Sequence, residues 1–94
     1  MILEKIIREK RGTIVDVRTA AEFSGGNASG SVNIPLNEIP NRLDALKGLN
    51  HPLILCCASG GRSGQAHAYL VRQGIECYNA GSWLDVDDLQ RQSA

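Results

Sequence analysis

The chain has no long apolar run, no excess of charge of either sign and few aromatic residues. Its longest unbroken apolar segment, Leu53 to Cys57, is far shorter than the roughly 20 residues that a membrane-spanning helix needs. Ten basic and ten acidic residues give a net charge of zero. We therefore expect neither nucleic acid nor a membrane as a partner, because both are bound through an excess of positive charge.

We also expect neither a disulfide framework nor a secretory signal. Its three cysteines, two of which are adjacent, do not form the even, spaced set typical of disulfide-rich domains, and the N-terminal stretch MILEKIIREK is too charged for a signal peptide. We expect a reduced, cytoplasmic protein with a reactive thiol. The cysteines and histidines lack metal-ligand spacing, so we expect neither a metal nor a cofactor. The length predicts one domain over residues 1–94, and we expect a monomer.

What is present is a regular alternation of strand and helix patterns. Strands are expected over 13–17, 32–34, 53–57 and 75–78. Helices are expected between Leu3 and Gly12, from a capping box of Thr19 and Glu22 through Phe23, between an Asn37 cap and Gly48, over 63–73, and over 83–90. This order predicts an α/β domain whose small parallel sheet, of four to five strands, carries helices on both faces.

The segment from Leu53 to Ser63 is the candidate active site. An apolar strand ends at Cys57, two glycines follow, and a helical pattern begins at Ser63. A loop that leads into a helix binds anions, because its N–H groups lack intrahelical partners and the helix dipole adds positive charge. Cys57 would point its sulfur into this pocket, and Arg62 is the only formal positive charge in the loop. Such surroundings favour the thiolate.

Three motifs stand in order along the chain: DVR with EF (Asp16 to Arg18, Glu22 and Phe23), NIP (Asn33 to Pro35), and C-x-x-G-x-R-S (Cys57 to Ser63). With Gly74 and the closing stretch Asn79 to Trp83, they resemble the rhodanese-like domain, a sulfurtransferase module. The compact length is closest to its small single-domain members of the phage-shock type. The first edge strand of that family is missing before Leu3, so we expect four strands rather than five.

The resemblance implies a two-step transfer of sulfane sulfur through Cys57. The Cys57 thiolate would take sulfur from thiosulfate or another persulfide donor, and a thiophilic acceptor, either a thiol or a protein sulfur carrier, would then remove it. Arg62 would favour an anionic donor. The persulfide anion would be held by the main-chain N–H groups of Ala58, Ser59, Gly60, Gly61, Arg62 and Ser63.

The adjacent cysteines leave alternatives open. Counted from Cys56 to Arg62, the spacing is the C-x5-R of cysteine-dependent phosphatases and arsenate reductases, whereas counted from Cys57 it is the shorter sulfurtransferase loop. A non-catalytic rhodanese-type interaction module is a third interpretation, although the cysteine, glycine and arginine are all present. Sulfur transfer is the interpretation that we favour.

Several other residues are expected to have structural roles. We predict that Cys56 and Cys77 are buried strand residues and that His67 packs on its helix. Asp16 and Arg18 are predicted to form an ion pair at the end of their strand.

Overall fold

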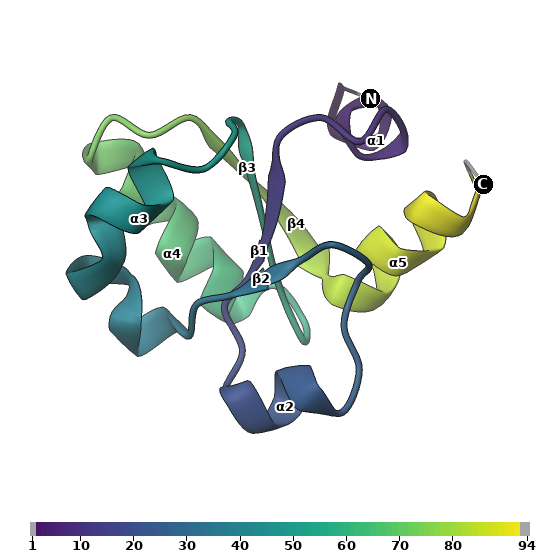
Figure 1. Cartoon of the computed structure of the whole chain (residues 1–94), viewed down its shortest axis with the longest axis horizontal. Helices are drawn as coiled ribbons and strands as arrows, with labels where there is room; N and C mark the ends of the chain where they lie inside the picture. Colours follow the sequence, from purple (N-terminus) through teal and green to yellow (C-terminus); the bar gives the residue numbers. More distant parts are fainter. Residues whose placement is uncertain (1, 93–94) are drawn as a thin grey trace.

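The computed structural model describes residues 2–92 and contains a four-stranded parallel sheet between two layers of helices (Figure 1). The strands are β1 (Thr13–Asp16), β2 (Val32–Asn33), β3 (Leu53–Cys57) and β4 (Cys77–Ser82), in the order β2-β1-β3-β4. The helices are α1 (Ile2–Arg8), α2 (Ala20–Ser24), the 3-10 helix η1 (Leu36–Arg42), α3 (Leu43–Lys47), α4 (Gly61–Arg72) and α5 (Trp83–Gln92). The predicted α/β class, parallel sheet and four strands are confirmed.

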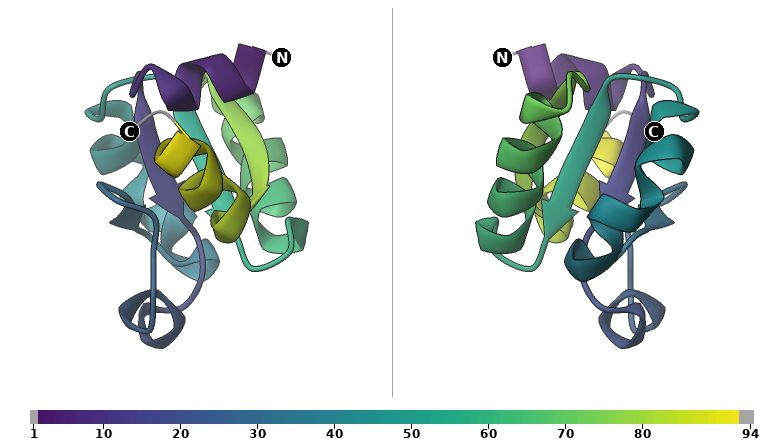
Figure 2. Two further views of the ribbon diagram at one scale, coloured as in Figure 1. Left: turned by 90° about the vertical axis from the view of Figure 1, so that its right-hand side faces the viewer. Right: turned by 90° about the vertical axis from the view of Figure 1, so that its left-hand side faces the viewer.

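The helices divide between the two faces of the sheet. Helices α1 and α5 cover one face, while α3 and α4 cover the other (Figure 2). Helix α2 lies beyond the edge at which the strands end (Figure 1). Ligands of parallel sheets bind at the carboxyl ends of the strands. The loop after β3 lies at this edge and is therefore in the place where a ligand is expected. No helix within residues 2–92 is long and apolar enough to cross a membrane.

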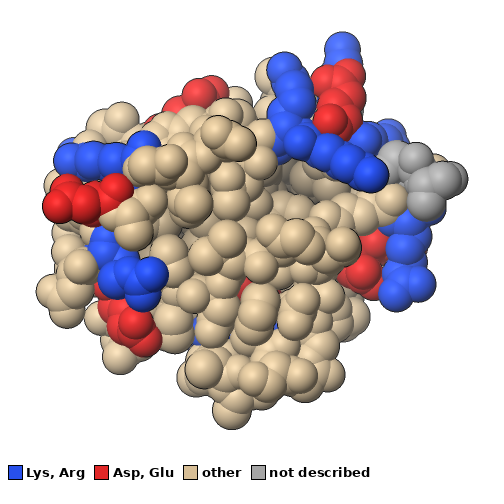
Figure 3. Space-filling model, viewed as in Figure 1, with Lys and Arg blue, Asp and Glu red and all other residues tan. Residues whose placement is uncertain are grey.

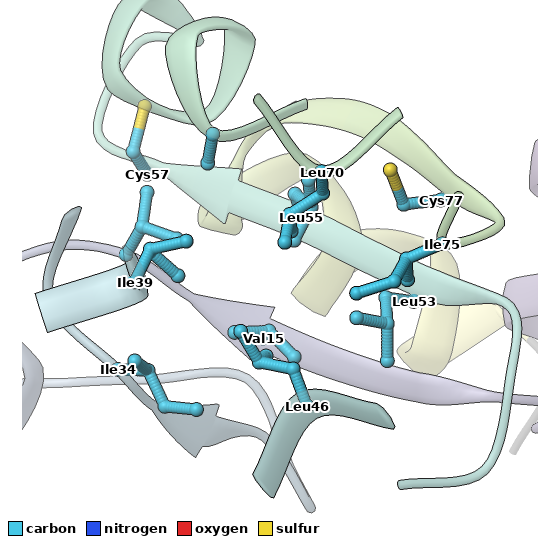
Figure 4. Close-up of a cluster of buried hydrophobic side chains, with 12 residues drawn as sticks. Val15, Ile34, Ile39, Leu46, Leu53, Leu55, Cys57, Leu70, Ile75 and Cys77 are labelled. Carbon is cyan, nitrogen blue, oxygen red and sulfur yellow. The ribbon is translucent and has the colours of Figure 1, made fainter. Parts of the chain in front are cut away.

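Two buried cores result, and β3 contributes to both. Every residue of β3 is buried, and its successive side chains alternate between the faces. Leu53, Leu55 and Cys57 join the core under α3 and α4, which Figure 4 shows. Ile54 and Cys56 join the core under α1 and α5. The two adjacent cysteines therefore lie on opposite faces of the sheet.

Several predicted element boundaries are wrong by a few residues. Helix α4 begins at Gly61 rather than Ser63, because Gly60 takes a positive φ of 103° and turns the chain directly into the helix. Strand β4 begins at Cys77 rather than Ile75, because the N–H of Ile75 still donates to Leu70 O of the preceding helix. Helix α1 ends at Arg8, well before Gly12.

The predicted helix after Asn37 is also different in kind. The chain forms the 3-10 helix η1 first and a single short α-helix, α3, after it. Pro35 precedes η1 and no side chain caps it, so the predicted Asn37 cap is wrong. Pro40 has no N–H to donate and lies inside η1, where it opposes a continuous α-helix.

Candidate active site

The sulfur of Cys57 lies at the end of β3 and points toward the loop that leads into α4 (Figure 4). The main-chain N–H of Gly60 donates to this sulfur at 2.9 Å, and that of Ser63 at 3.5 Å. The Ser63 hydroxyl lies 3.4 Å from it, and either atom could be the donor. The predicted loop thus wraps around the Cys57 sulfur, with two of the expected N–H groups directed at it.

These contacts change the acidity of the Cys57 thiol. Burial acts to raise its pKa, since only 1% of the residue is exposed. The hydroxyl of Ser63 and the main-chain N–H groups of Ser63, Gly60 and Ser59 outweigh burial and lower the pKa to about 7. At neutral pH a large fraction of Cys57 is therefore thiolate, the nucleophilic form.

Cys56 and Cys77 lie in different surroundings. Burial, together with the nearby Asp16 carboxylate, raises the pKa of Cys56 to about 12, so Cys56 stays a thiol. Burial also raises the pKa of Cys77, whose sulfur lies 4.0 Å from the main-chain oxygen of His67. The alternative that counts from Cys56 to Arg62 therefore lacks an ionised nucleophile.

Asn79, on β4, is a site residue that the sequence reasoning missed. The buried hydroxyl of Ser63 lies 2.7 Å from Asn79 Oδ1, so that both this oxygen and the Cys57 sulfur are within reach of its proton, and the amide of Asn79 donates to Gly60 O at 3.3 Å. The N–H of Gly81 also donates to Asn79 Oδ1. Asn79 thereby ties the loop around Cys57 to the neighbouring strand. The stretch Asn79 to Trp83 contributed to the family resemblance, but this contact was not predicted, because it spans 16 residues from Ser63.

Arg62 is not a free positive charge at the rim. Its two terminal nitrogens donate to the two carboxylate oxygens of Glu22, at 2.7 and 3.0 Å. The predicted capping box is also present, because the Glu22 carboxylate accepts from the N–H of Thr19 while the Thr19 hydroxyl accepts from the N–H of Glu22. Arg62 and then Thr19 lower the pKa of Glu22 to about 2. Glu22 therefore caps α2 and neutralises Arg62 at once.

Asp16 and Arg18 form the predicted ion pair, deep inside the protein. An oxygen of Asp16 lies 2.8 Å from Arg18, and neither side chain is more than 6% exposed. Arg18 also donates to Gly26 O at 2.7 Å, and its guanidinium stacks on the ring of Trp83 at 4.8 Å. Its contacts hold the segment after α2 against α5, which is a structural role.

Hollows on the surface lie on both faces of the sheet. A shallow cleft of about 260 Å³ lies at the carboxyl edge of the sheet and is lined by Val17, Thr19, Pro35, Leu36, Asn37 and Arg62. A larger cavity of about 650 Å³ lies between α1, β1 and α5, on the face to which Cys57 does not point. Within residues 2–92, no cluster of three or more His, Cys, Asp or Glu side chains could hold a metal ion.

The fold and the site together define a class: α/β proteins that hold a candidate cysteine nucleophile in an anion-binding loop at the end of a parallel strand. Residues 2–86 match the family model of the rhodanese-like domain. The chain therefore belongs to the rhodanese-like domain family, as its motifs predicted.

Known relatives and structures agree with this membership. The chain is 40% identical over 69 residues to the thiosulfate sulfurtransferase GlpE of Stutzerimonas stutzeri, a match that covers 73% of this chain and 62% of that protein. A rhodanese-like domain protein from Staphylococcus aureus superposes with a TM-score of 0.74 at 30% identity, over 92% of this chain and 83% of that one. An Escherichia coli rhodanese solved with anions superposes with a TM-score of 0.70 at 32% identity, over 78% of this chain and 88% of that one. The chain thus spans about three fifths of the length of GlpE.

Proposed function

We propose that this chain is a sulfurtransferase that carries sulfane sulfur as a persulfide on Cys57. The Cys57 thiolate attacks the outer sulfur of thiosulfate or of another persulfide donor. A new S–S bond forms, the old bond to that sulfur breaks, and the leaving group (sulfite, in the case of thiosulfate) departs with the bonding pair. The observation that carries the proposal is the Cys57 sulfur itself, with its pKa of about 7 among N–H donors.

In the second step a thiophilic acceptor takes the outer sulfur and the Cys57 thiolate leaves. A small thiol or a protein sulfur carrier would serve as acceptor. The outer sulfur of the persulfide carries the negative charge, and the N–H groups from Ala58 to Ser63 are the donors available to hold it. The names of the relatives support this assignment, because GlpE is a thiosulfate sulfurtransferase and the Escherichia coli rhodanese was solved with anions.

The shape and acidity of the site favour sulfur transfer over phosphate chemistry. Cys57 is only 1% exposed at the bottom of its loop, where a single terminal sulfur atom reaches it more readily than a phosphoryl group with three equatorial oxygens. Cys56, the cysteine with phosphatase spacing, is fully buried with a pKa of about 12. The thiolate of Cys57 likewise favours an active enzyme over a module without catalysis.

Intact-protein mass spectrometry after incubation with thiosulfate, before and after cyanide, tests the proposal. We expect wild type to gain one sulfur, about 32 Da, and to lose it to cyanide. Cys57→Ser should gain nothing, whereas the matched control Cys56→Ser should gain and release sulfur as wild type does. An adduct that persists in Cys57→Ser, or that requires Cys56, would contradict the assignment.

A further inference from the structure

The Arg62 side chain lies at the carboxyl edge of the sheet, the edge at which β3 ends with Cys57. It lines the shallow cleft at the carboxyl edge of the sheet together with Val17 and Leu36, and Val17 N–H donates to Cys56 O beside the site. The hydrogen bonds to Glu22 are the main cause of the raised pKa of Arg62, and the charge of Cys57 also contributes to it, so Arg62 and Cys57 lie within electrostatic reach of each other. A charge on Arg62 therefore acts on an anion that enters the loop.

Glu22 cancels that charge. The carboxylate meets the guanidinium through two parallel hydrogen bonds of 2.7 and 3.0 Å, the geometry in which arginine binds carboxylates most strongly. Its pKa of about 2 keeps Glu22 ionised throughout the neutral range. The nearby Asp16 is paired with Arg18 in the same way. An incoming donor therefore meets ion pairs without net charge, and the main-chain N–H groups are left to attract it.

We propose that Glu22 is a specificity-determining residue that neutralises Arg62 and so favours sulfur donors with one negative charge over dianions such as thiosulfate. The proposal rests on the sulfur transfer proposed above. An unpaired guanidinium attracts a dianion about twice as strongly as a monoanion at the same distance, because Coulomb energy is proportional to charge. When Glu22 neutralises the guanidinium, the dianion loses this additional attraction. The N–H donors of the loop still attract the dianion and the monoanion.

Glu22→Gln separates this role from helix capping. Glutamine serves at the third position of a capping box as glutamate does, so the contacts between Thr19 and residue 22 at the start of α2 are retained. The substitution removes only the negative charge and leaves Arg62 uncompensated. Glu76→Gln is the matched control. It removes the same charge from the residue before β4, at the opposite end of the sheet from Cys57.

The experiment compares two donors that differ by one charge: thiosulfate, a dianion, and methanethiosulfonate, a monoanion. In both, the Cys57 thiolate takes the outer sulfur, and sulfite or methanesulfinate leaves with the bonding pair. The rate constant for gain of sulfur by Cys57 is measured by mass spectrometry at low salt and about pH 9, two pH units above the pKa of Cys57, so that Cys57 is ionised in every variant.

We expect Glu22→Gln to raise the ratio of the thiosulfate rate to the methanethiosulfonate rate by about three- to sevenfold, and 0.5 M salt to shrink this gain. Glu76→Gln should leave the ratio at its wild-type value. An unchanged ratio in Glu22→Gln, with both donors still loading Cys57, would overturn the role of Glu22 and leave sulfur transfer intact. Failure of wild type to load from either donor would overturn the sulfur transfer itself and the proposal that rests on it.

Discussion

At the scale of single residues, two adjacent cysteines show how surroundings decide chemistry. Cys56 and Cys57 share a strand, yet their thiols have pKa values of about 12 and about 7. The alternation of β3 sends Cys56 into an apolar core beside Asp16 and sends Cys57 toward a loop of N–H donors. Residue type and neighbourhood in the sequence are the same for both. Only the face of the sheet differs.

The acidity of Cys57 gives a prediction for pH dependence. Alkylation of Cys57 by iodoacetamide should rise with pH through a midpoint near 7, because the thiolate is the reacting form and Glu22 and Arg62 keep their charges across this range. Ser63→Ala removes the hydroxyl that helps to hold the thiolate. It should move the midpoint upward by about one pH unit.

Peptide mass spectrometry after timed alkylation measures this midpoint. Ser59→Ala is the control, since Ser59 contributes to the low pKa of Cys57 through its main-chain N–H, which alanine keeps. Cys56 and Cys77 should react far more slowly in the folded protein, because burial raises the pKa of both. A wild-type midpoint above 8.5 would show that the loop does not stabilise the thiolate.

At the scale of elements, one turn depends on a glycine for two reasons. Gly12, before β1, has a φ of 73°, and a Cβ there would collide with the main-chain oxygen of Pro52. Gly74, after α4, has a similar φ of 78° but open space around it. Gly74→Ala should lower the free energy of unfolding by about 1–2 kcal/mol through the left-handed backbone alone. Gly12→Ala should lower it by clearly more.

Urea unfolding of both variants, followed by circular dichroism, tests this difference. Equal losses would mean that the segment around Pro52 moves aside without cost, against the close packing seen between the start of β1 and the loop before β3.

The local signals in the sequence predicted the elements better than their ends. β-branched or continuous apolar runs placed β1 and β3, and the capping box at Thr19 placed the start of α2. The start of α4 was wrong because it depends on the positive φ of Gly60, a loop conformation that the sequence does not specify. The start of β4 was wrong because its pairing with β3, rather than its own composition, decides where the strand begins.

The candidate site also has a part that the sequence predicted and a part that it did not. The positions of Cys57, Gly60 and Ser63 follow from one continuous motif, so the sequence was sufficient to predict that loop. The partners of the loop are distant in sequence: Glu22 lies 40 residues from Arg62, and Asn79 lies 16 from Ser63. Such contacts exist only once the sheet has formed. The capping motif already accounted for Glu22 in the sequence, so its second contact, the ion pair with Arg62, was not predicted.

At the scale of the whole molecule, Arg18 joins parts that are far apart in the chain. It pairs with Asp16 at the end of β1, donates to Gly26 O after α2, and stacks on Trp83 at the start of α5. Arg18→Met should lower the free energy of unfolding by about 3–5 kcal/mol, because it leaves the carboxylate of Asp16 buried without its charged partner, with only the main-chain N–H of residue 18 donating to it. For a domain of ordinary stability, that is a large fraction of the total.

Chemical denaturation of Arg18→Met measures this loss. The matched control is Arg91→Met, which breaks an exposed ion pair with Asp87 on α5 and should cost less than about 1 kcal/mol. If the free energy of unfolding falls by similar amounts in the two variants, Arg18 does not hold the molecule together as its contacts indicate.

On the surface, positive and negative side chains lie close to one another, so that charge is balanced locally. On the face that Figure 3 shows, charged side chains of both signs gather near the outline and leave most of the middle without charge. Among the described residues, exposed ion pairs include Arg8 with Glu4, Arg11 with Glu9, and Arg42 with Glu38. The neutral pair of Arg62 and Glu22 at the candidate site follows the same rule.

The strand order also has a consequence for how the chain acquires its structure. β1 lies at the centre of the sheet, but its longer partner is β3, with Thr13 opposite Leu53. When only residues up to 50 have left the ribosome, β3 and β4 are not yet available. The only strand pairing that can then form is the two-residue pairing of β1 with β2. We expect the sheet, and with it the candidate active site, to assemble only after β3 and β4 have been synthesised, and more slowly than a helical bundle of equal length.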